Sequence, residues 1–264
     1  MANVKKPAVV TYHSDIVRQK TLYHIYRPLQ NWFLSSIDRV VCTSPNYLET
    51  SKNLSLFRDK VDVVPLGIDE ALGPKKCKDM QSGKGLHYGK FILFVGALRT
   101  YKGIKVLLEA AKLVKGTVVL AGGGDLLPSL ELQLRKEKIE NVVLLGEVTD
   151  KEKFKLMSQS RAVVLPSNQR NEAFGMVLVE ASMMGRAMIS TELGTGTSLV
   201  NLNGVTGLVV KADCEKALAN AMNRMLENED EAELFGAAAR KRYEGYFTGQ
   251  QMCKKYVEIY STLI

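Results

Sequence analysis

The feature that most constrains the fold is a regular alternation of apolar and amphipathic segments that begins at Lys90. The apolar segments are FILFVGAL, TVVLAGGG, NVVLLGEV, AVVLPS, AMIST and GVTGLVV. Helical patterns such as IKVLLEAAKLV and FGMVLVEASMMG lie between them. Strands that are apolar throughout and separated by helices specify a parallel sheet covered on both faces. The sequence therefore predicts an α/β chain with a complete Rossmann-like domain in its C-terminal part.

The residues before this alternation repeat its design in a shorter form. Strands are expected over 7–12, over the apolar part of 38–45, where a turn with capping residues follows, and over 61–69. A helix is expected over 16–37, with Pro28 as a break or a start, and another from about Asn46. These elements predict a second, shortened α/β domain.

The stretch 73–89 lacks apolar periodicity and is rich in glycine and lysine, which is typical of an exposed connection. We therefore divide the chain into an N-terminal α/β domain (1–72), a linker (73–89), a Rossmann-like domain (90–246) and a terminal helix (247–264). The terminal helix is expected to pack back on the N-terminal domain.

Composition and charge narrow the function classes. A formal charge of +8 favours polyanionic partners, among them nucleic acid, anionic lipid and phosphorylated small molecules. Nucleic acid is not expected, because the basic residues are spread along the chain and form no known binding signature. Cys42, Cys77, Cys214 and Cys253 have no metal-ligand spacing and favour reduced thiols in the cytosol. No apolar run reaches the ~20 residues that span a bilayer.

The residues that follow the expected strands predict where a ligand binds, because open α/β sheets bind ligands beyond the carboxyl ends of their strands. Glycines follow the first three strands of the Rossmann-like domain, at GALRTYKG, GGGD and GEVT. A helix that begins near Phe174 or Gly175 would present free N–H groups and the positive end of its dipole. An anionic ligand is therefore expected there, although GGG by itself is equally typical of a tight turn.

Two carboxylates accompany this expected anion site. Glu172 precedes the helix, and Glu180 lies about two turns inside its apolar sequence MVLVEASMM. A carboxylate in such a helix is costly to bury, so Glu180 is expected to face a polar ligand or a cation. At ~1.5 Å per residue the two are at most roughly 12 Å apart, which suits the two ends of a nucleotide diphosphate sugar. The alternative is two surface carboxylates, with Glu172 favouring the helix dipole.

Residues 91–208 resemble the family 4 retaining glycosyltransferases. The resemblance is carried by FVGALRTYKG, LAGGGDL and LGEV, and above all by the Glu-x7-Glu hallmark within NEAFGMVLVEASMMG. VDVVPLGID is similar to the strand and turn that precede the family's interdomain linker. The resemblance implies a GT-B architecture of two Rossmann-like halves, of which the N-terminal half binds the acceptor.

The resemblance also implies roles for individual residues. Glu172 would hold the donor-sugar hydroxyls, Glu180 the ribose hydroxyls, and Lys102 a phosphate. The family's phosphate arginine falls at Ala97 here, and Arg99 is expected to replace it. The implied donor site consists of Gly96, Arg99, Lys102, Gly123, Val148, Glu172, Phe174, Gly175, Met176, Val177 and Glu180.

His13, in TYHSD, matches the family's acceptor-side histidine, although a strand-end histidine that caps a turn would have the same sequence. The implied catalytic residues are His13, Arg99, Lys102 and Glu172. No metal and no cofactor is expected, because the two cations and the helix N-terminus would stabilise the leaving diphosphate.

The segment HSDIVRQK (13–20) resembles the corresponding segment of bacterial O-antigen and capsular polysaccharide mannosyltransferases. The expected reaction is transfer of a hexose, with mannose from GDP-mannose as the best choice, to a growing glycan or lipid-linked acceptor. A departure is the short N-terminal part, which lacks the early strands of a full half. The alternatives are a truncated nucleotide-sugar-binding module without catalysis, or a subunit completed by another chain. Homo-oligomers are also expected, because the shortened N-terminal sheet would leave an exposed edge.

A third class is a protein that binds a membrane or another protein through the basic and aromatic segment 16–37. A core helix with solvated Arg18, Lys20 and Arg27 explains the same residues. The expected location is the cytoplasm, with peripheral binding to the inner face of the cytoplasmic membrane.

Overall fold

The computed structural model describes residues 7–15, 20–72 and 88–264, with the backbone alone for residues 20–24. Most of the expected linker 73–89 lies outside the described residues. The first part contains β1 (Val9–Tyr12), α1 (Lys20–Ser36), β2 (Arg39–Cys42), α2 (Pro45–Thr50) and β3 (Val61–Val63). Short 3-10 turns span Leu54–Lys60, Glu70–Leu72 and Thr100–Lys102.

The second part alternates strands and helices as the pattern predicts. Its strands are β4 (Phe91–Val95), β5 (Thr117–Ala121), β6 (Val142–Gly146), β7 (Ala162–Leu165), β8 (Ala187–Glu192) and β9 (Gly207–Lys211). Its helices are α3 (Ile104–Ala111), α4 (Leu127–Glu137), α5 (Asp150–Gln159), α6 (Met176–Met183), α7 (Thr197–Val200), α8 (Glu215–Glu227), α9 (Glu229–Tyr246) and α10 (Gly249–Ser261). The short α7 was not expected from the sequence.

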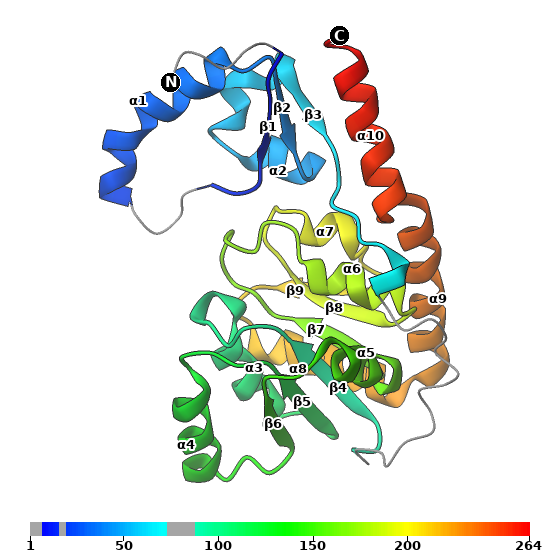
Figure 1. The fold of residues 1–264 in the computed structure, drawn as a ribbon. Helices are drawn as coiled ribbons and strands as arrows, with labels where there is room; N and C mark the ends of the chain where they lie inside the picture. Colours follow the sequence, from blue (N-terminus) through cyan, green and yellow to red (C-terminus); the bar gives the residue numbers. More distant parts are fainter. Residues whose placement is uncertain (1–6, 16–19, 73–87) are drawn as a thin grey trace.

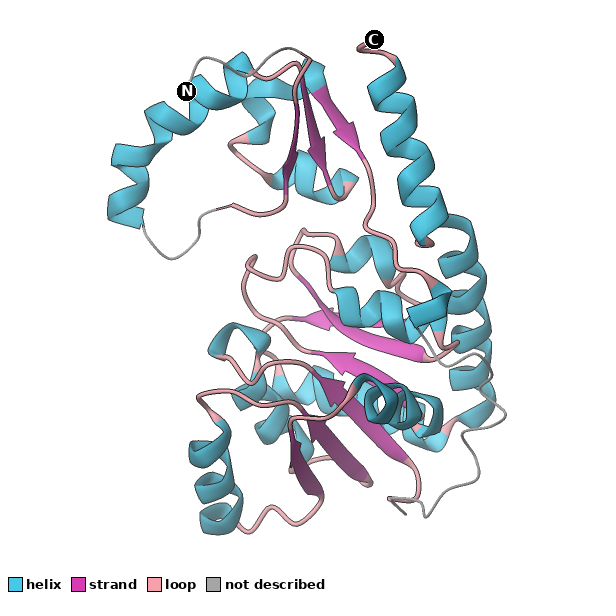
Figure 2. Ribbon diagram, in the orientation of Figure 1, coloured by secondary structure: helices cyan, strands magenta, loops and turns pink. Residues whose placement is uncertain are grey.

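The six strands of the second part form one parallel sheet in the order β6-β5-β4-β7-β8-β9 (Figures 1 and 2). The chain starts at β4, adds β5 and β6 on one side, and then returns to add β7, β8 and β9 on the other. The direction of winding therefore reverses between β4 and β7. In open α/β sheets ligands bind at such a reversal, outside the carboxyl ends of the strands.

The apolar sequence of each strand supplies both faces of this sheet. In β4, Ile92 and Phe94 join a hydrophobic cluster with residues of α3, α4 and α8. Phe91, Leu93 and Val95 join a second cluster with residues of α5, α6 and α9. Because side chains alternate along a strand, a strand covered on both faces must be apolar at every position. This confirms the predicted α/β class and parallel sheet.

The first part forms a smaller parallel sheet in the order β1-β2-β3. Its core contains Tyr12, Leu34, Val40 and Tyr47, all less than 9% exposed. The strand expected over 61–69 is wrong in length, because β3 ends at Val63. Pro65 follows almost at once, and proline has no N–H to donate to a strand ladder.

The expected break at Pro28 is also wrong, because α1 continues from Lys20 to Ser36 with Pro28 inside it. Proline removes one hydrogen bond of the helix, at a cost of ~3 kcal/mol. Pro28 is exposed, so the carbonyl that loses its partner can turn toward water, and buried Gln30 and Leu34 hold the following turns against the first sheet.

The last helix connects the two sheets. Thr248 pairs with Ile68 in an isolated bridge and caps α10, accepting from Gln251 N at 3.2 Å. Ile259 of α10 packs with Val41 and Val64, and α10 stands beside the first sheet while α9 lies along the second (Figure 1).

Candidate functional site

A pocket of about 340 Å³ opens at the winding reversal, between the loops that follow β4 and β7. This volume is within the range of small-molecule sites. His13, from the loop after β1, lies at its first-domain side. The lining residues are His13, Val95, Gly96, Tyr101, Lys102, Lys153, Asn171, Glu172, Ala173, Phe174, Gly175, Met176, Val177 and Glu180.

Close packing of two loops brings Lys102 into this pocket. Gly103 has a φ of +70°, and a Cβ atom built there would lie 1.9 Å from the carbonyl oxygen of Pro166. The loop after β4 therefore lies directly against the loop after β7, and only glycine fits at the contact. Lys102, the preceding residue, forms an ion pair with Glu172 across these loops.

The Lys102–Glu172 pair is nearly enclosed. The two side chains are 14% and 9% exposed, and the Ser167 hydroxyl donates to Glu172 Oε2 at 3.0 Å. A buried carboxylate needs both a cation and hydrogen bonds, and Glu172 has both. The pair places a positive and a negative group side by side in the pocket wall.

A second ion pair joins α5 to α6 in the same pocket. Lys153 Nζ is 2.7 Å from Glu180 Oε1 and 2.9 Å from Asp150 Oδ1. Burial lowers the pKa of Lys153, but its bonds to Glu180 and Asp150 raise it above the ordinary value of 10.5, so Lys153 is cationic at neutral pH. The prediction that Glu180 faces a polar partner and not the core is therefore confirmed. Lys153 itself was missed, since KEKFKL offers several lysines and only the fold selects one.

The start of α6 faces the same pocket. Gly175 has a φ of +83° and begins the helix without a side-chain cap, and Met176 and Val177 follow it in the lining. The first N–H groups of a helix have no partner within the helix and carry partial positive charge. Two lysines and this helix end together suit an anionic group.

Asn171 is a second lining residue that the sequence analysis missed. Its Oδ1 atom is buried and has no hydrogen-bond partner within the part of the chain that the structure describes. An unpaired buried acceptor costs about 1–3 kcal/mol, which a ligand that donates a hydrogen bond would recover. The glutamate hallmark beside it was the only sequence signal at this position.

Nine of the predicted site residues meet in the pocket: His13, Gly96, Lys102, Glu172, Phe174, Gly175, Met176, Val177 and Glu180. Arg99, Gly123 and Val148 do not line it. Arg99 is exposed beside the Thr100–Lys102 turn, Gly123 lies against the Glu147 side chain, and Val148 packs on a hydrophobic cluster. Their proposed roles stay predictions.

Two absences concern residues 7–15, 20–72 and 88–264, the part of the chain that the structure describes. Over these ranges, the side chains of residues 20–24 excepted, no three His, Cys, Asp or Glu side chains gather in a way that could hold a metal ion. Within the same ranges, each helix is too short or too polar to cross a bilayer.

Comparison with known proteins assigns families to both parts of the chain. Residues 79–242 match the family described as glycosyl transferases group 1, and residues 2–72 match glycosyltransferase family 4. The chain is 40% identical over 256 residues to the O-antigen chain mannosyltransferase C of Escherichia coli, covering 97% of this chain and 69% of that protein. It is 43% identical to the D-rhamnosyltransferase WbpZ of Pseudomonas aeruginosa, covering 94% and 65%. The chain thus spans about two thirds of the length of these relatives.

Solved structures share the fold. Sucrose-phosphate synthase from Thermosynechococcus elongatus superposes with a TM-score of 0.83 at 24% identity, covering 98% of this chain and 68% of that one. HepE of Anabaena, in complex with UDP and glucose, also gives 0.83, at 20% identity and 98% and 72% coverage. With these family matches and two relatives at 40% identity or more, the chain belongs to the group 1 glycosyltransferases of the GT-B fold.

Proposed function

We propose that the chain is a retaining hexosyltransferase that moves mannose from GDP-mannose to a growing glycan or lipid-linked acceptor in surface polysaccharide synthesis. One observation carries the proposal: the pocket at the winding reversal combines Lys102, Lys153 and the uncapped start of α6 with Glu172 and Glu180. Cations and helix N–H groups suit a diphosphate, and carboxylates accept hydrogen bonds from sugar hydroxyls.

The names of two relatives support the proposed donor sugar and suggest one competitor. One is named for mannose and the other for D-rhamnose. These sugars share the axial 2-hydroxyl and differ at C6, where rhamnose has a methyl group. Mannose therefore remains the first choice, and a 6-deoxy sugar of the same configuration is the competing donor.

The proposed chemistry uses side chains and backbone N–H groups of the pocket, with one arginine beside it, and no metal or cofactor. The acceptor hydroxyl oxygen bonds to C1 of the sugar on the face from which the phosphate leaves, and the bond between C1 and the phosphate oxygen breaks with its electron pair going to the diphosphate. The hydroxyl proton passes to the departing diphosphate, which carries the negative charge that develops as the bond breaks. Lys102 and the N–H groups of Met176 and Val177 stabilise that charge, with Arg99 as a further cation from the neighbouring turn. Glu172 holds the sugar hydroxyls and Glu180 the ribose, while His13 faces the acceptor on the opposite side.

A membrane surface is the proposed location of the acceptor. Helix α1 exposes Ile25, Leu29 and Trp32, which are 76%, 48% and 48% exposed and lie at spacings of four and three residues on one face. An exposed apolar stripe with basic neighbours such as Arg27 suits an anionic interface. Co-sedimentation with phosphatidylglycerol vesicles tests this: binding that Ile25→Glu abolishes supports it, and no binding by the unaltered chain refutes it.

Calorimetry with a panel of sugar nucleotides tests the proposed donor. We expect GDP-mannose to bind more tightly than UDP-glucose, and Glu180→Ala to weaken binding by removing the ribose contact. Absence of nucleotide-sugar binding by a folded sample would refute the proposal.

The second candidate is a donor-binding module that does not transfer the sugar, either alone or until a partner chain or second copy joins it. The coverage of about two thirds of the relatives' length favours keeping this candidate. It predicts normal donor binding without transfer to lipid extracts. Turnover by the purified chain alone would refute it.

A further inference from the structure

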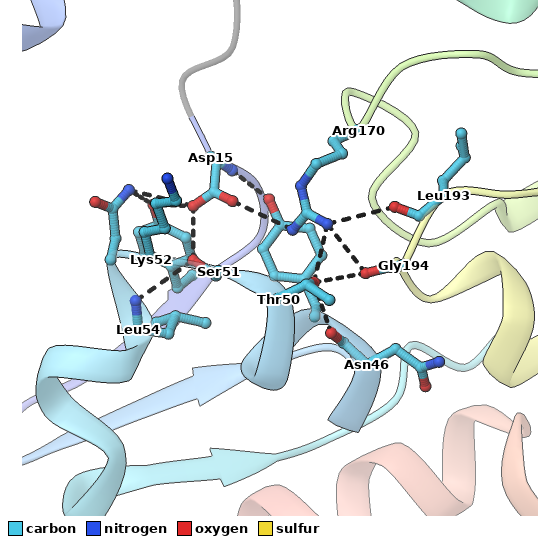
Figure 3. A network of polar contacts seen from close by, with 12 residues as sticks. Asp15, Asn46, Thr50, Ser51, Lys52, Leu54, Arg170, Leu193 and Gly194 are labelled. Atoms are coloured by element: carbon cyan, nitrogen blue, oxygen red, sulfur yellow. Dashed lines mark hydrogen bonds and ion pairs between the residues drawn. The ribbon is translucent and has the colours of Figure 1, made fainter.

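Arg170 reaches from the second domain to the first (Figure 3). It does not line the pocket but directly precedes two lining residues, Asn171 and Glu172. It lies in the loop between β7 and α6. Its Nη1 atom donates to Thr50 Oγ1 at 2.9 Å, and Nη2 is 3.4 Å from Asp15 Oδ2. The guanidinium carbon is 5.0 Å from the centre of the Tyr47 ring. All three partners belong to the first domain.

The same guanidinium is also held within its own domain. Arg170 Nη1 is 3.1 Å from the Gly194 carbonyl oxygen and 3.3 Å from that of Leu193. Thr50 donates to the Gly194 oxygen as well, at 2.6 Å. Arginine has five donors in a rigid planar arrangement, so one side chain can join several loops at fixed angles. Arg170 therefore ties the loops after β1, β7 and β8 and helix α2 together (Figure 3).

The first-domain side of this contact is built without help from Arg170. Asp15 Oδ1 accepts from Tyr12 OH at 2.9 Å, from Ser51 Oγ at 2.7 Å and from Asn53 Nδ2 at 3.2 Å. The backbone N–H of Asp15 donates to the Tyr47 hydroxyl. These bonds leave Oδ2 directed at Arg170, so Asp15 is a fixed anchor and not a mobile surface carboxylate. His13, two residues earlier, lies in the pocket.

A second contact anchors the same loop on the other side of Glu172. Ala173 is 3% exposed and packs in the first-domain cluster with Tyr12, Leu34 and Tyr47. Glu172 thus lies between Arg170 and Ala173, one residue held by polar contacts and the other by apolar contacts to the opposite domain. The position of the donor-side carboxylate is coupled to the position of the first domain.

We propose that Arg170 is a positioning residue that holds the two domains at the spacing needed for sugar transfer. It fixes the loop with His13 against the loop with Glu172, so that the acceptor side and the donor side meet across the pocket. The inference rests on the proposed transferase function. It assigns Arg170 no contact with the nucleotide, whose expected partners all lie in the second domain.

Two substitutions separate this role from a general loss of stability. Arg170→Ala removes every contact that Arg170 makes and leaves the Thr50–Gly194 hydrogen bond in place. Thr50→Val replaces the hydroxyl of an exposed first-domain residue by a methyl group of nearly equal size. We expect Arg170→Ala to lower kcat at least about tenfold with donor affinity within about threefold of the unaltered chain, because a misplaced reaction centre costs rate and not nucleotide contacts. Thr50→Val should lower kcat less, and the loss in the double variant should be smaller than the sum of the two single losses, because both variants remove the Arg170–Thr50 hydrogen bond. Arg135→Ala, on exposed α4, is the matched control.

Domain spacing is measured directly by pulsed electron paramagnetic resonance. Spin labels at Leu56→Cys and Leu132→Cys, which are 56% and 68% exposed, report on the two domains in a background with Cys77, Cys214 and Cys253 replaced by Ser. We expect Arg170→Ala to broaden the distance distribution, with and without GDP-mannose, and Arg170→Lys to restore it in part.

Three outcomes would overturn the inference: an unchanged distance distribution, a loss of nucleotide binding in Arg170→Ala, or additive effects of Arg170→Ala and Thr50→Val. The spacing measurement needs neither donor nor acceptor. If the unaltered chain binds no sugar nucleotide, the proposed function fails, while the spacing result still shows whether Arg170 holds the domains.

Discussion

Replacement of Gly103 by alanine tests whether the contact between the two pocket loops creates the donor site. Gly103 has a φ of +70° and lies against Pro166, where a Cβ atom would be 1.9 Å from the carbonyl oxygen. Gly204 is the matched control, because its φ is +72° and no atom lies within 4 Å of its Cβ position. Both substitutions impose the same backbone strain, and only Gly103→Ala forces two segments apart.

The structure sets the expected size of each effect. The left-handed conformation costs alanine about 1–2 kcal/mol, partly offset by ~0.4–1 kcal/mol from the stiffer unfolded chain. Gly204→Ala should therefore lower the free energy of unfolding by about 1 kcal/mol. Gly103→Ala must also move the loops by about 1 Å, and overpacking of this kind adds ~1–3 kcal/mol. The expected difference between the two variants is thus about 1–3 kcal/mol.

Urea unfolding followed by circular dichroism measures the free energy of unfolding, and calorimetry measures the affinity of the donor site for GDP. We expect Gly103→Ala to weaken nucleotide binding at least about tenfold, because Lys102 is displaced with its neighbour, and Gly204→Ala to leave binding unchanged. Equal stability losses, or unaltered GDP affinity in Gly103→Ala, would refute the reasoning.

Three further predictions concern single side chains. Lys153→Met should lower the free energy of unfolding by about 1–3 kcal/mol, because Glu180 loses its cation. Adding Glu180→Leu should restore the stability measured in urea titrations but not the binding of GDP-mannose. Recovery of both would contradict the assignment of Glu180 to the donor site. Asn171→Ala should leave the free energy of unfolding equal or up to ~1 kcal/mol higher, because an unpaired buried acceptor is removed. In calorimetry the variant should bind GDP-mannose more weakly than the unaltered chain does and GDP equally well. Unaltered affinity for both ligands would show that Oδ1 does not contact the sugar. Burial raises the pKa of Tyr12 above its ordinary value of 10.0, so the stability that this pKa shift contributes is complete below pH 10 and is lost as pH rises above 10. Tyr12→Phe should flatten the fall in the free energy of unfolding above pH 10, and an unchanged slope would exclude Tyr12 as the cause.

Much of the fold followed from local pattern. Strands such as Phe91–Val95 are apolar at every position, and this is required only when both faces of a sheet are covered. The expected break at Pro28 and the expected strand over 61–69 were both wrong, and both errors concern proline. The effect of a proline on a helix or strand depends on its surroundings in the fold, which the local sequence does not show. Pro28 is tolerated because it lies on an exposed helix face, whereas Pro65 stops a strand that the apolar pattern alone would continue.

The sequence by itself determined the parallel α/β class, the end of the sheet where ligands bind, and the family hallmark of Glu172 and Glu180. Only the tertiary structure decided which charged side chains pair. Lys102 pairs with Glu172, which lies seventy residues later in the sequence, and Lys153, not a neighbouring lysine, pairs with Glu180. Arg170 pairs with Asp15 of the other domain. The physical reason is that periodicity reports which face of an element is buried, a local property of the chain. Which charged groups meet depends on how loops pack at distances that no local pattern encodes.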